Sequence, residues 1–437
     1  MTPFWLSLPM HLQDGLTSFG LLLATFLVGF CLFRGFAPWS LVVALLKRFA
    51  WANALFVILI GCALGLGIGL LSQERGLRQG SAQAADKFDL IVAAPGSEIT
   101  TLLATVFLQP TDLPLINGDI YSEVETHPRV SLAAPLAFGD SWQGFIVVGT
   151  TAQFLEHLTE GSIEGRFWLT KQEAVAGSAV PLEIGETFEP SHGFGDAAQV
   201  GAHAGEVFKV VGKMSATGSP WDQAILVPVE EVWAVHGLAT GHAPERADQL
   251  GPPYDAAYFP GTPAVVIQAE SLGSTYSLQA EFNRETDTMA FFPGAILNQL
   301  HRLMGDISEA MRLMARVTQI LVTLAVLLAL FILTKLFQPQ MAMLRALGAP
   351  GRFVMAVVWS YATTLLAAGA VLGVLLGLIS SAVLAQIVAA QTGVAIPTSF
   401  AWGEVRLVLG FVSIASLLSL IPAWATLRAP LVDVLRR

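Results

Sequence analysis

The sequence is poor in charge and almost free of cysteine. Of its 437 residues only 13% are charged and 54% are hydrophobic, whereas soluble globular proteins carry about 25% charged residues. This shortage excludes a disordered chain and argues against an ordinary cytosolic enzyme, because water cannot solvate so much apolar surface. The two cysteines, Cys31 and Cys62, both lie in apolar runs. The chain therefore has no disulfide scaffold.

Motifs for nucleotide binding and for hydrolysis are also missing. Six residues separate Gly205 from Gly212, where a phosphate-binding loop has four, and Met214 stands where the magnesium-binding Ser or Thr belongs. No Gly-x-Ser-x-Gly nucleophile elbow occurs. The interpretation is a non-catalytic chain with no cofactor of its own, so that any ATP-driven step requires another chain.

The charges that are present divide the chain into two kinds of segment. Residues 73–310 hold 30 acidic and 11 basic residues, and the remainder holds 3 acidic and 12 basic residues. An acidic block of this kind excludes nucleic acid as a partner, because nucleic acid requires a basic face. The pattern indicates a water-facing domain outside the cytoplasm, framed by membrane segments.

Five long apolar runs supply these segments. They are Leu16–Phe33, Trp51–Leu71, Val317–Phe337, Phe353–Ile379 and Leu407–Ala425. Each is long enough for a helix to cross the roughly 30 Å hydrocarbon core of a membrane. The first run has a signal peptide as its alternative, but residues 1–15 carry no Lys or Arg, so a retained helix is favoured.

The positions of the basic residues predict the orientation. Arg34, Lys47 and Arg48 follow the first run, and Arg428, Arg436 and Arg437 follow the fifth. Lys335 lies at the end of the third run, and Arg345 and Arg352 lie between it and the fourth. Such residues stay in the cytoplasm. The C-terminus is then cytoplasmic, and residues 73–310 and the N-terminus lie outside. Within the first of these loops, Pro38–Phe49 has helical spacing typical of an interfacial helix.

The outer block mixes strand and helix patterns. Strands are expected in five short segments: Phe88–Ala94, Phe145–Thr150, Val207–Lys213, Ala224–Pro228 and Ala264–Ala269. Helices are expected over Ser271–Arg284 and Pro293–Arg316, and the second is expected to continue into the third apolar run as a stalk. An α+β domain is therefore predicted between the second and third runs.

The segment between the third and fourth runs, residues 338–352, is the most informative motif. Leu344 and Leu347 give a short helix an apolar edge, Arg345 and Arg352 keep it in water, and Gly348 ends it. The plain alternative is an amphipathic loop that only joins two helices.

Its core, Leu-Arg-Ala-Leu-Gly-Ala over residues 344–349, resembles the coupling-helix motif of the FtsX/MacB-like permeases of ABC transporters. Residues 164–168, 184–188 and 208–212 are similar to elements of the periplasmic core of MacB-type members, and residues 422–436 are similar to the family's C-terminal ending. The chain departs from the family in its extra N-terminal run, in Ala429-Pro430 where the family usually has Asp-Pro, and in having no fused ATPase domain.

The resemblance implies a fold class, an α-helical membrane protein with four core transmembrane helices and one extra N-terminal helix. A large α+β periplasmic domain is inserted after the second apolar run. The implied divisions are residues 1–35 (extra helix), 36–72 (interfacial and first core helix), 73–310 (periplasmic domain with stalk) and 311–437 (three core helices, with the coupling helix at 338–352). The implied location is the bacterial inner membrane.

The resemblance also implies partners and a mechanism. Two permease copies pair with an ATPase dimer that holds ATP and Mg²⁺, and ATP hydrolysis there moves the periplasmic domain to drive export or extraction of a periplasmic or lipidic substrate. The implied ATPase contact consists of Leu344, Arg345, Ala346, Leu347, Gly348, Ala349 and Arg352. A scaffold that regulates a periplasmic hydrolase, lipoprotein or adaptor is the alternative role.

Two further sets of residues are candidates for a site. His192 and His203 flank a Gly/Ala-rich loop and are candidate zinc ligands, which leaves a membrane-anchored metal-binding domain as another alternative; ordinary surface histidines fit the same pattern. Small-residue stripes suit close helix packing, either in a dimer seam or within one chain. They comprise Gly61 and Gly65 in the second run and Gly369, Gly373 and Gly377 in the fourth.

Overall fold

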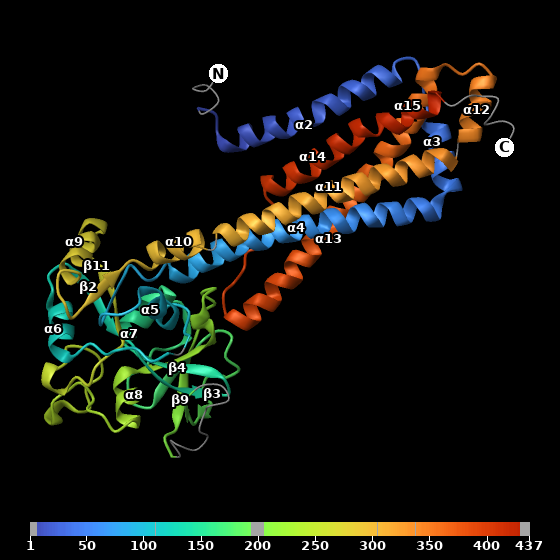
Figure 1. Cartoon of the computed structure of the whole chain (residues 1–437). Coiled ribbons are helices and arrows are strands. Elements are labelled where there is room, and N and C mark those ends of the chain that lie inside the picture. The colour runs from blue at the N-terminus through green and yellow to red at the C-terminus, as the bar shows by residue number, and fades with distance from the viewer. Residues whose placement is uncertain (1–6, 110, 194–204, 304, 337, 429–437) are drawn as a thin grey trace. The chain divides into compact units, whose positions relative to one another are not determined.

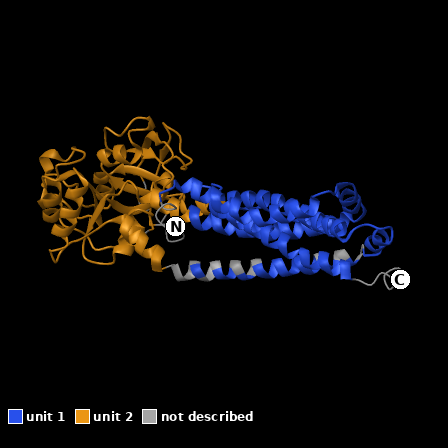
Figure 2. Cartoon of the chain, turned by 90° about the horizontal axis from the view of Figure 1, so that it is seen from above, with its two compact units in different colours: residues 1–76, 306–386, 397–437 blue, residues 77–305, 387–396 orange. Residues whose placement is uncertain are grey.

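The computed structural model describes residues 7–109, 111–193, 205–303, 305–336 and 338–428, and the chain divides into two compact units (Figure 1, Figure 2). Unit 1 comprises residues 1–76, 306–386 and 397–437, and unit 2 comprises residues 77–305 and 387–396. Unit 2 thus contains most of the acidic block. It also includes a ten-residue segment, 387–396, that the sequence did not single out.

Unit 1 is built from helices (Figure 1). They are α2 (Met10–Phe33), α3 (Trp39–Arg48), α4 (Ala50–Ala85), α11 (Gly305–Leu336), α12 (Gln338–Ala346), α13 (Gly351–Thr392), α14 (Trp402–Leu418) and α15 (Leu420–Arg428). Four helical stretches among the described residues are long and apolar enough to span a membrane: Met10–Phe33, Ala50–Ala85, Gly351–Thr392 and Trp402–Arg428. The remaining predicted run lies in α11, where the described apolar stretch is Ile320–Ala329. The predicted α-helical membrane architecture is confirmed.

The first apolar run packs as an integral helix of unit 1. The hydroxyl of Thr25 in α2 lies 3.1 Å from that of Ser413 in α14, and both side chains are buried. Gly29 faces the ring of Trp359 in α13, and a Cβ on this glycine would lie 3.1 Å from the ring atom Cη2. Hydroxyl pairs and small residues of this kind hold helices together where no water competes.

Unit 2 is an α+β domain with two sheets. The smaller sheet has the strand order β12-β1-β11-β2, and its strands are β12 (Met289–Phe291), β1 (Leu90–Ala93), β11 (Ala264–Ala269) and β2 (Val130–Pro135). The larger sheet has the order β5-β9-β6-β10-β4-β3-β8, with β7 also paired to β9. Its strands are β5 (Ile163–Gly165), β9 (Phe208–Met214), β6 (Glu173–Ala176), β10 (Ala224–Pro228), β4 (Phe145–Thr150), β3 (Ala137–Trp142), β8 (Ser191–His192) and β7 (Thr187–Phe188).

Short helices join the strands of unit 2. They are α5 (Glu98–Thr105), α6 (Gly118–Thr126), α7 (Ala152–Thr159), α8 (Val229–Val235), α9 (Leu272–Phe282) and α10 (Pro293–Leu303). Several begin at side-chain caps: Ser97, Asn117, Thr151 and Ser271 each accept a hydrogen bond from the third backbone N–H that follows. Such caps satisfy donors that the first helical turn leaves open. The sequence therefore encodes these helix starts locally.

The strands predicted from hydrophobic runs are the central ones. β4, β10 and β11 have the predicted bounds, and β1 and β9 lie within a few residues of theirs. Every residue of β1 and of β10 is buried, which explains why the apolar pattern marked them. The predicted stalk corresponds to α10 and α11, which flank residue 304, a residue outside the described part of the chain.

Candidate functional site

The segment between α11 and α13 forms a short helix with a tightly closed end. Ala349 N–H donates to the Leu344 carbonyl at 3.0 Å and Gly348 N–H to the Arg345 carbonyl at 3.1 Å, and Gly348 has a φ of +94°. This pair of bonds around a left-handed glycine is the Schellman helix ending. Pro350 follows, so the chain turns sharply into α13. The turn predicted at Gly348 is present.

The two faces of α12 differ in exposure. Met341 and Ala342 are buried in the core of unit 1, whereas the side chains of Met343 and Leu347 are 61% and 76% exposed. Among the other predicted contact residues, Ala346 and Gly348 are exposed and Leu344, Arg345 and Ala349 are half-buried. The segment thus combines a fixed inner face with an apolar outer edge that nothing in unit 1 covers among the described residues.

Arg352, the last residue of the predicted contact set, takes part in bonding within the chain. Its guanidinium donates to the carbonyl of Cys31 and lies 5.8 Å from the ring centroid of Phe36. These contacts hold the start of α13 to the end of α2 and to the loop before α3. Figure 1 shows α3, α12 and α15 gathered at one end of the bundle. Most of the basic residues used to predict the cytoplasmic side therefore share one end of unit 1.

Charged pairs mark the other end of unit 1, where the chain leaves for unit 2. Arg75 donates to Glu404 at 3.0 Å and to the carbonyl of Ser399 at 2.9 Å, and the Glu404 side chain is only 1% exposed. Arg406 lies 2.8 Å from Asp14. A buried carboxylate requires a charged or hydrogen-bonding partner, so Arg75 ties the end of the α4 membrane segment to the start of α14.

The glycine stripes of α4 and α13 face each other within the chain. A Cβ on Gly61 would lie 2.8 Å from Leu372, and one on Gly65 would lie 3.0 Å from Leu376. In return, a Cβ on Gly369, Gly373 or Gly377 would lie 2.6 Å from Ile60, Leu64 and Ile68, respectively. Each large side chain of one helix thus occupies the space above a glycine of the other. This arrangement is the intrachain packing that stood as the alternative to a dimer seam.

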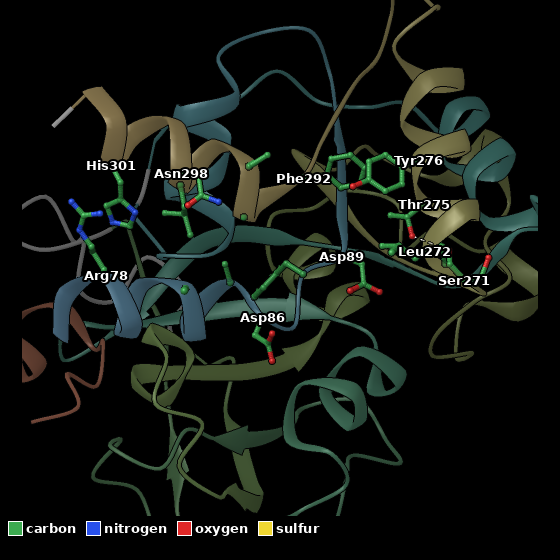
Figure 3. A pocket seen from close by; sticks show the side chains of 17 residues that line it. Arg78, Asp86, Asp89, Ser271, Leu272, Thr275, Tyr276, Phe292, Asn298 and His301 are labelled. Atoms are coloured by element: carbon green, nitrogen blue, oxygen red, sulfur yellow. Dashed lines mark hydrogen bonds between the residues drawn. The ribbon is translucent and has the colours of Figure 1, made fainter. Parts of the chain in front are cut away.

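Unit 2 contains a hollow of about 780 Å³ bordered by α4, α9 and α10. Figure 3 shows Arg78 and His301 together at one end of it and the rings of Tyr276 and Phe292 at the other. Burial, and then the charge of Arg78, lower the pKa of His301, whose Nε2 lies 3.3 Å from the Ser81 hydroxyl. Asp86 and Asp89 also line the hollow. Its mixture of aromatic, cationic and anionic groups suits an amphiphilic ligand.

The family-like element at residues 164–168 serves as a structural clamp. Both terminal nitrogens of Arg166 donate to Glu173, which also accepts from the backbone N–H of Leu169 and Thr170. Hydrogen bonding from Arg166 lowers the pKa of Glu173 to about 2. A bidentate pair of this kind fixes the loop between β5 and β6.

Of the two predicted zinc ligands, the structure describes only His192. His203 lies outside the described residues, while His192 meets Asp140 and His236. Sequence spacing did not single out Asp140, because it lies on another strand far along the chain. Gly139, directly before Asp140, is the one feature of the sequence that could have drawn attention to this residue. A glycine inside a strand often marks a bulge, and bulges are common next to functional groups.

Comparisons with known proteins identify the C-terminal part of the chain. Residues 313–431 match the family model described as FtsX-like permease C-terminal. The resemblance found from the sequence motifs is thereby confirmed for this part. No curated protein matches the chain.

Solved structures similar to the chain include two outer domains. One is the periplasmic region of MacB from Actinobacillus actinomycetemcomitans, at 10% identity and a TM-score of 0.30, covering 49% of this chain and 95% of that one. The other is the extracellular domain of the noncanonic ABC-type transporter YknZ from Gram-positive bacteria, at 11% identity and a TM-score of 0.28, covering 46% of this chain and 98% of that one.

Proposed function

Because the chain carries an FtsX-like permease C-terminal domain over residues 313–431, we propose that it is the membrane subunit of an ABC transporter complex. A separate ATPase dimer, which holds ATP and Mg²⁺, binds the α12 segment of each of two permease copies. ATP hydrolysis then moves unit 2, on the outer side of a bacterial inner membrane, and drives export or extraction of a periplasmic or lipidic substrate.

The α12 segment carries this proposal. Leu347 and Met343 form an apolar edge that is exposed in unit 1, and the Schellman ending holds this edge in a fixed position. Exposed apolar side chains beside a cation are typical of protein interfaces. A loop that only joins two helices needs neither the apolar edge nor the closed turn.

The continuity of the long helices supports transmission of movement. α4 runs unbroken from Ala50 to Ala85, and α13 from Gly351 to Thr392, so each belongs to both units. A helix is stiff along its axis over such lengths. In this proposal, movement at the α12 end of unit 1 passes to unit 2 along α4 and α13.

The hollow bordered by α4, α9 and α10 is the proposed contact for the substrate. Two of these three helices lead toward unit 1, α4 directly and α10 ahead of α11. Any change in the angle between α4 and α10 alters the shape of the hollow. Its aromatic and charged lining suits a lipidic or amphiphilic molecule.

Copurification with the ATPase tests the proposed contact. The full chain is produced together with a candidate ABC ATPase subunit from the same organism. The variant Arg345→Glu/Leu347→Glu is compared with a matched control, Leu272→Glu/Arg284→Glu. Leu272 is 75% exposed and Arg284 is exposed, both in unit 2. The control thus makes the same chemical changes away from α12.

We expect the wild type and the control to retain the ATPase and the α12 variant to lose it. Normal membrane insertion and an unchanged melting temperature show that the variant is folded. Retention of the ATPase by a folded α12 variant would show that the contact lies elsewhere on the chain.

A further inference from the structure

We propose that Asp140, His192 and His236 form a binding site for one Zn²⁺ ion in unit 2. Each residue offers one ligand atom, and all three atoms lie within 4.8 Å of one another. This site is independent of the proposed ATPase contact, because none of its residues belongs to unit 1.

The distances between the ligand atoms have the size that zinc requires. His236 Nε2 lies 3.2 Å from His192 Nδ1, and Asp140 Oδ1 lies 3.4 Å from His192 Nδ1 and 3.5 Å from His236 Nε2. Ligands bound at about 2.0–2.1 Å in a tetrahedron are separated from each other by about 3.3 Å. The three atoms therefore form one face of a zinc tetrahedron with almost no rearrangement.

Hydrogen bonding outside the cluster sets the ring of His236 in the form that binds metal. Its Nδ1 lies 2.7 Å from the carbonyl oxygen of Val232. A carbonyl can only accept, so Nδ1 carries a hydrogen and the neutral ring has its lone pair at Nε2. A histidine held by a backbone carbonyl in this way is the usual outer support of a metal ligand.

The same bond turns a metal-binding nitrogen of His236 toward the other two ligand atoms. The lone pair at His236 Nε2 faces the carboxylate of Asp140, which is also an acceptor and whose side chain is only 3% exposed. A carboxylate oxygen and an imidazole nitrogen are both ligands that Zn²⁺ accepts. A divalent ion satisfies both atoms and the nitrogen of His192 together.

The backbone around the cluster brings the three ligands together. Asp140 in β3 and His192 in β8 are directly paired across the larger sheet, and Gly193 N–H donates to the Gly139 carbonyl at 2.8 Å. Gly139 lies at a register shift of β3. A Cβ there would lie 3.1 Å from Cε1 and Nε2 of His236, so the glycine leaves the room that the imidazole needs.

The cluster is open to solvent on one side. His192 lines a hollow of about 490 Å³ together with Phe138, Gly139 and Gly193. Water from this hollow can take the fourth position of the tetrahedron, the arrangement found in zinc sites that exchange a ligand. Two imidazoles and one carboxylate without sulfur suit Zn²⁺ and neighbouring first-row ions better than Ca²⁺ or Mg²⁺.

The test measures metal binding by the full chain, purified in detergent with a tag that contains no histidine. After removal of metal with EDTA, Zn²⁺ is titrated by calorimetry, and Co²⁺ is added separately to record the visible absorption of a tetrahedral site. We expect one Zn²⁺ per chain and an intense Co²⁺ band. A wild-type chain that binds less than one Zn²⁺ per ten molecules overturns the proposal.

Variants assign the bound ion to this cluster. His192→Gln and His236→Gln each remove one ligand and are expected to weaken Zn²⁺ binding more than about 100-fold. His157→Gln is the control, because it removes an imidazole in α7 of the same unit that is hydrogen-bonded to the Lys87 carbonyl. It is expected to leave Zn²⁺ binding unchanged. Equal binding in all three variants, or equal loss in all three, overturns the assignment.

Two further measurements separate lost binding from lost folding. Zn²⁺ is expected to raise the melting temperature of the wild type and of His157→Gln, and to leave those of His192→Gln and His236→Gln unchanged. Gly139→Ala keeps all three ligands but displaces the His236 ring, and it is expected to weaken Zn²⁺ binding at least about 10-fold. Full-strength binding by Gly139→Ala contradicts the proposed position of His236.

Discussion

Gly369 of α13 lies so close to Ile60 of α4 that a Cβ on the glycine would stand 2.6 Å from the Cβ of the isoleucine. Real Cβ atoms do not approach one another so closely. The contact repeats one turn further at Gly373 and Leu64, and again at Gly377 and Ile68. α4 and α13 are therefore in contact along a seam that tolerates no larger residue on α13.

Enlarging a glycine in this seam is expected to destabilise unit 1. Gly373→Leu forces α4 and α13 apart, and overpacking of this kind costs about 1–3 kcal/mol. The melting temperature in detergent is expected to fall. Gly410→Leu in α14 is the matched control, because nothing lies within 4 Å of a Cβ at Gly410. Equal melting temperatures for Gly373→Leu and the wild type would show that the seam is not close-packed.

The closed end of α12 is expected to depend on glycine at position 348. Its φ of +94° is unfavourable for any residue with a Cβ, so Gly348→Ala opens the Schellman ending at a cost of about 1 kcal/mol. Retention of the ATPase is expected to weaken severalfold in copurification. Gly351→Ala is the matched control, since its Cβ makes only ordinary contact with Leu427 at 3.5 Å. Equal retention of the ATPase by both variants would show that the turn at Gly348 does not contribute to the partner contact.

The Arg166–Glu173 clamp is expected to make stability depend on pH. Arg166 lowers the pKa of Glu173 from its ordinary value of 4.5 to about 2. Because the carboxylate is favoured in the folded state, the contribution is present above about pH 4.5 and is lost as the pH falls toward 2. Glu173→Gln is expected to melt below the wild type at pH 7, with a difference that shrinks between pH 5 and pH 3.

The control for this titration is Glu156→Gln, which removes an exposed carboxylate of the same unit. Its melting temperature is expected to follow the wild type over the same pH range. A difference between the wild type and Glu173→Gln that stays constant down to pH 3 would mean that Glu173 ionises in the ordinary way.

The proposed orientation is tested by labelling single cysteines from outside the cell. In a chain with Cys31 and Cys62 replaced by serine, Asp248→Cys is expected to react with a membrane-impermeant thiol reagent, and Ala346→Cys only after the membrane is permeabilised. Asp248 is fully exposed in unit 2 and Ala346 is exposed on α12. Reaction of both cysteines in intact cells would place α12 and unit 2 on the same side and contradict the proposal.

Much of the architecture was predictable because it rests on local physical needs. A span of hydrocarbon requires about 20 apolar residues whatever surrounds them, so α2, α4 and α13 were visible as runs. The central strands β4, β10 and β11 were visible because they are buried along most of their length. The end of α12 was visible because Gly348 ends a helix through its own backbone.

The short edge strands were not predictable for the opposite reason. β7 and β8 have two residues each, too few for any hydrophobic period, and they exist only because β9 and β3 offer backbone partners. The inclusion of residues 387–396 in unit 2 has a similar origin. Ala395 N–H donates to the Gly218 carbonyl at 3.0 Å, a contact between segments that nothing in their own sequence relates.

By itself, the sequence determined that this chain is a multi-pass membrane protein with an acidic domain inserted between apolar runs, because hydropathy and charge are sums over neighbouring residues. Only the tertiary structure decided which distant side chains meet. Strand pairing brings Asp140 and His192 next to each other and close to His236. Helix packing places the glycine stripe of α4 against that of α13. In both cases the residues are far apart along the chain.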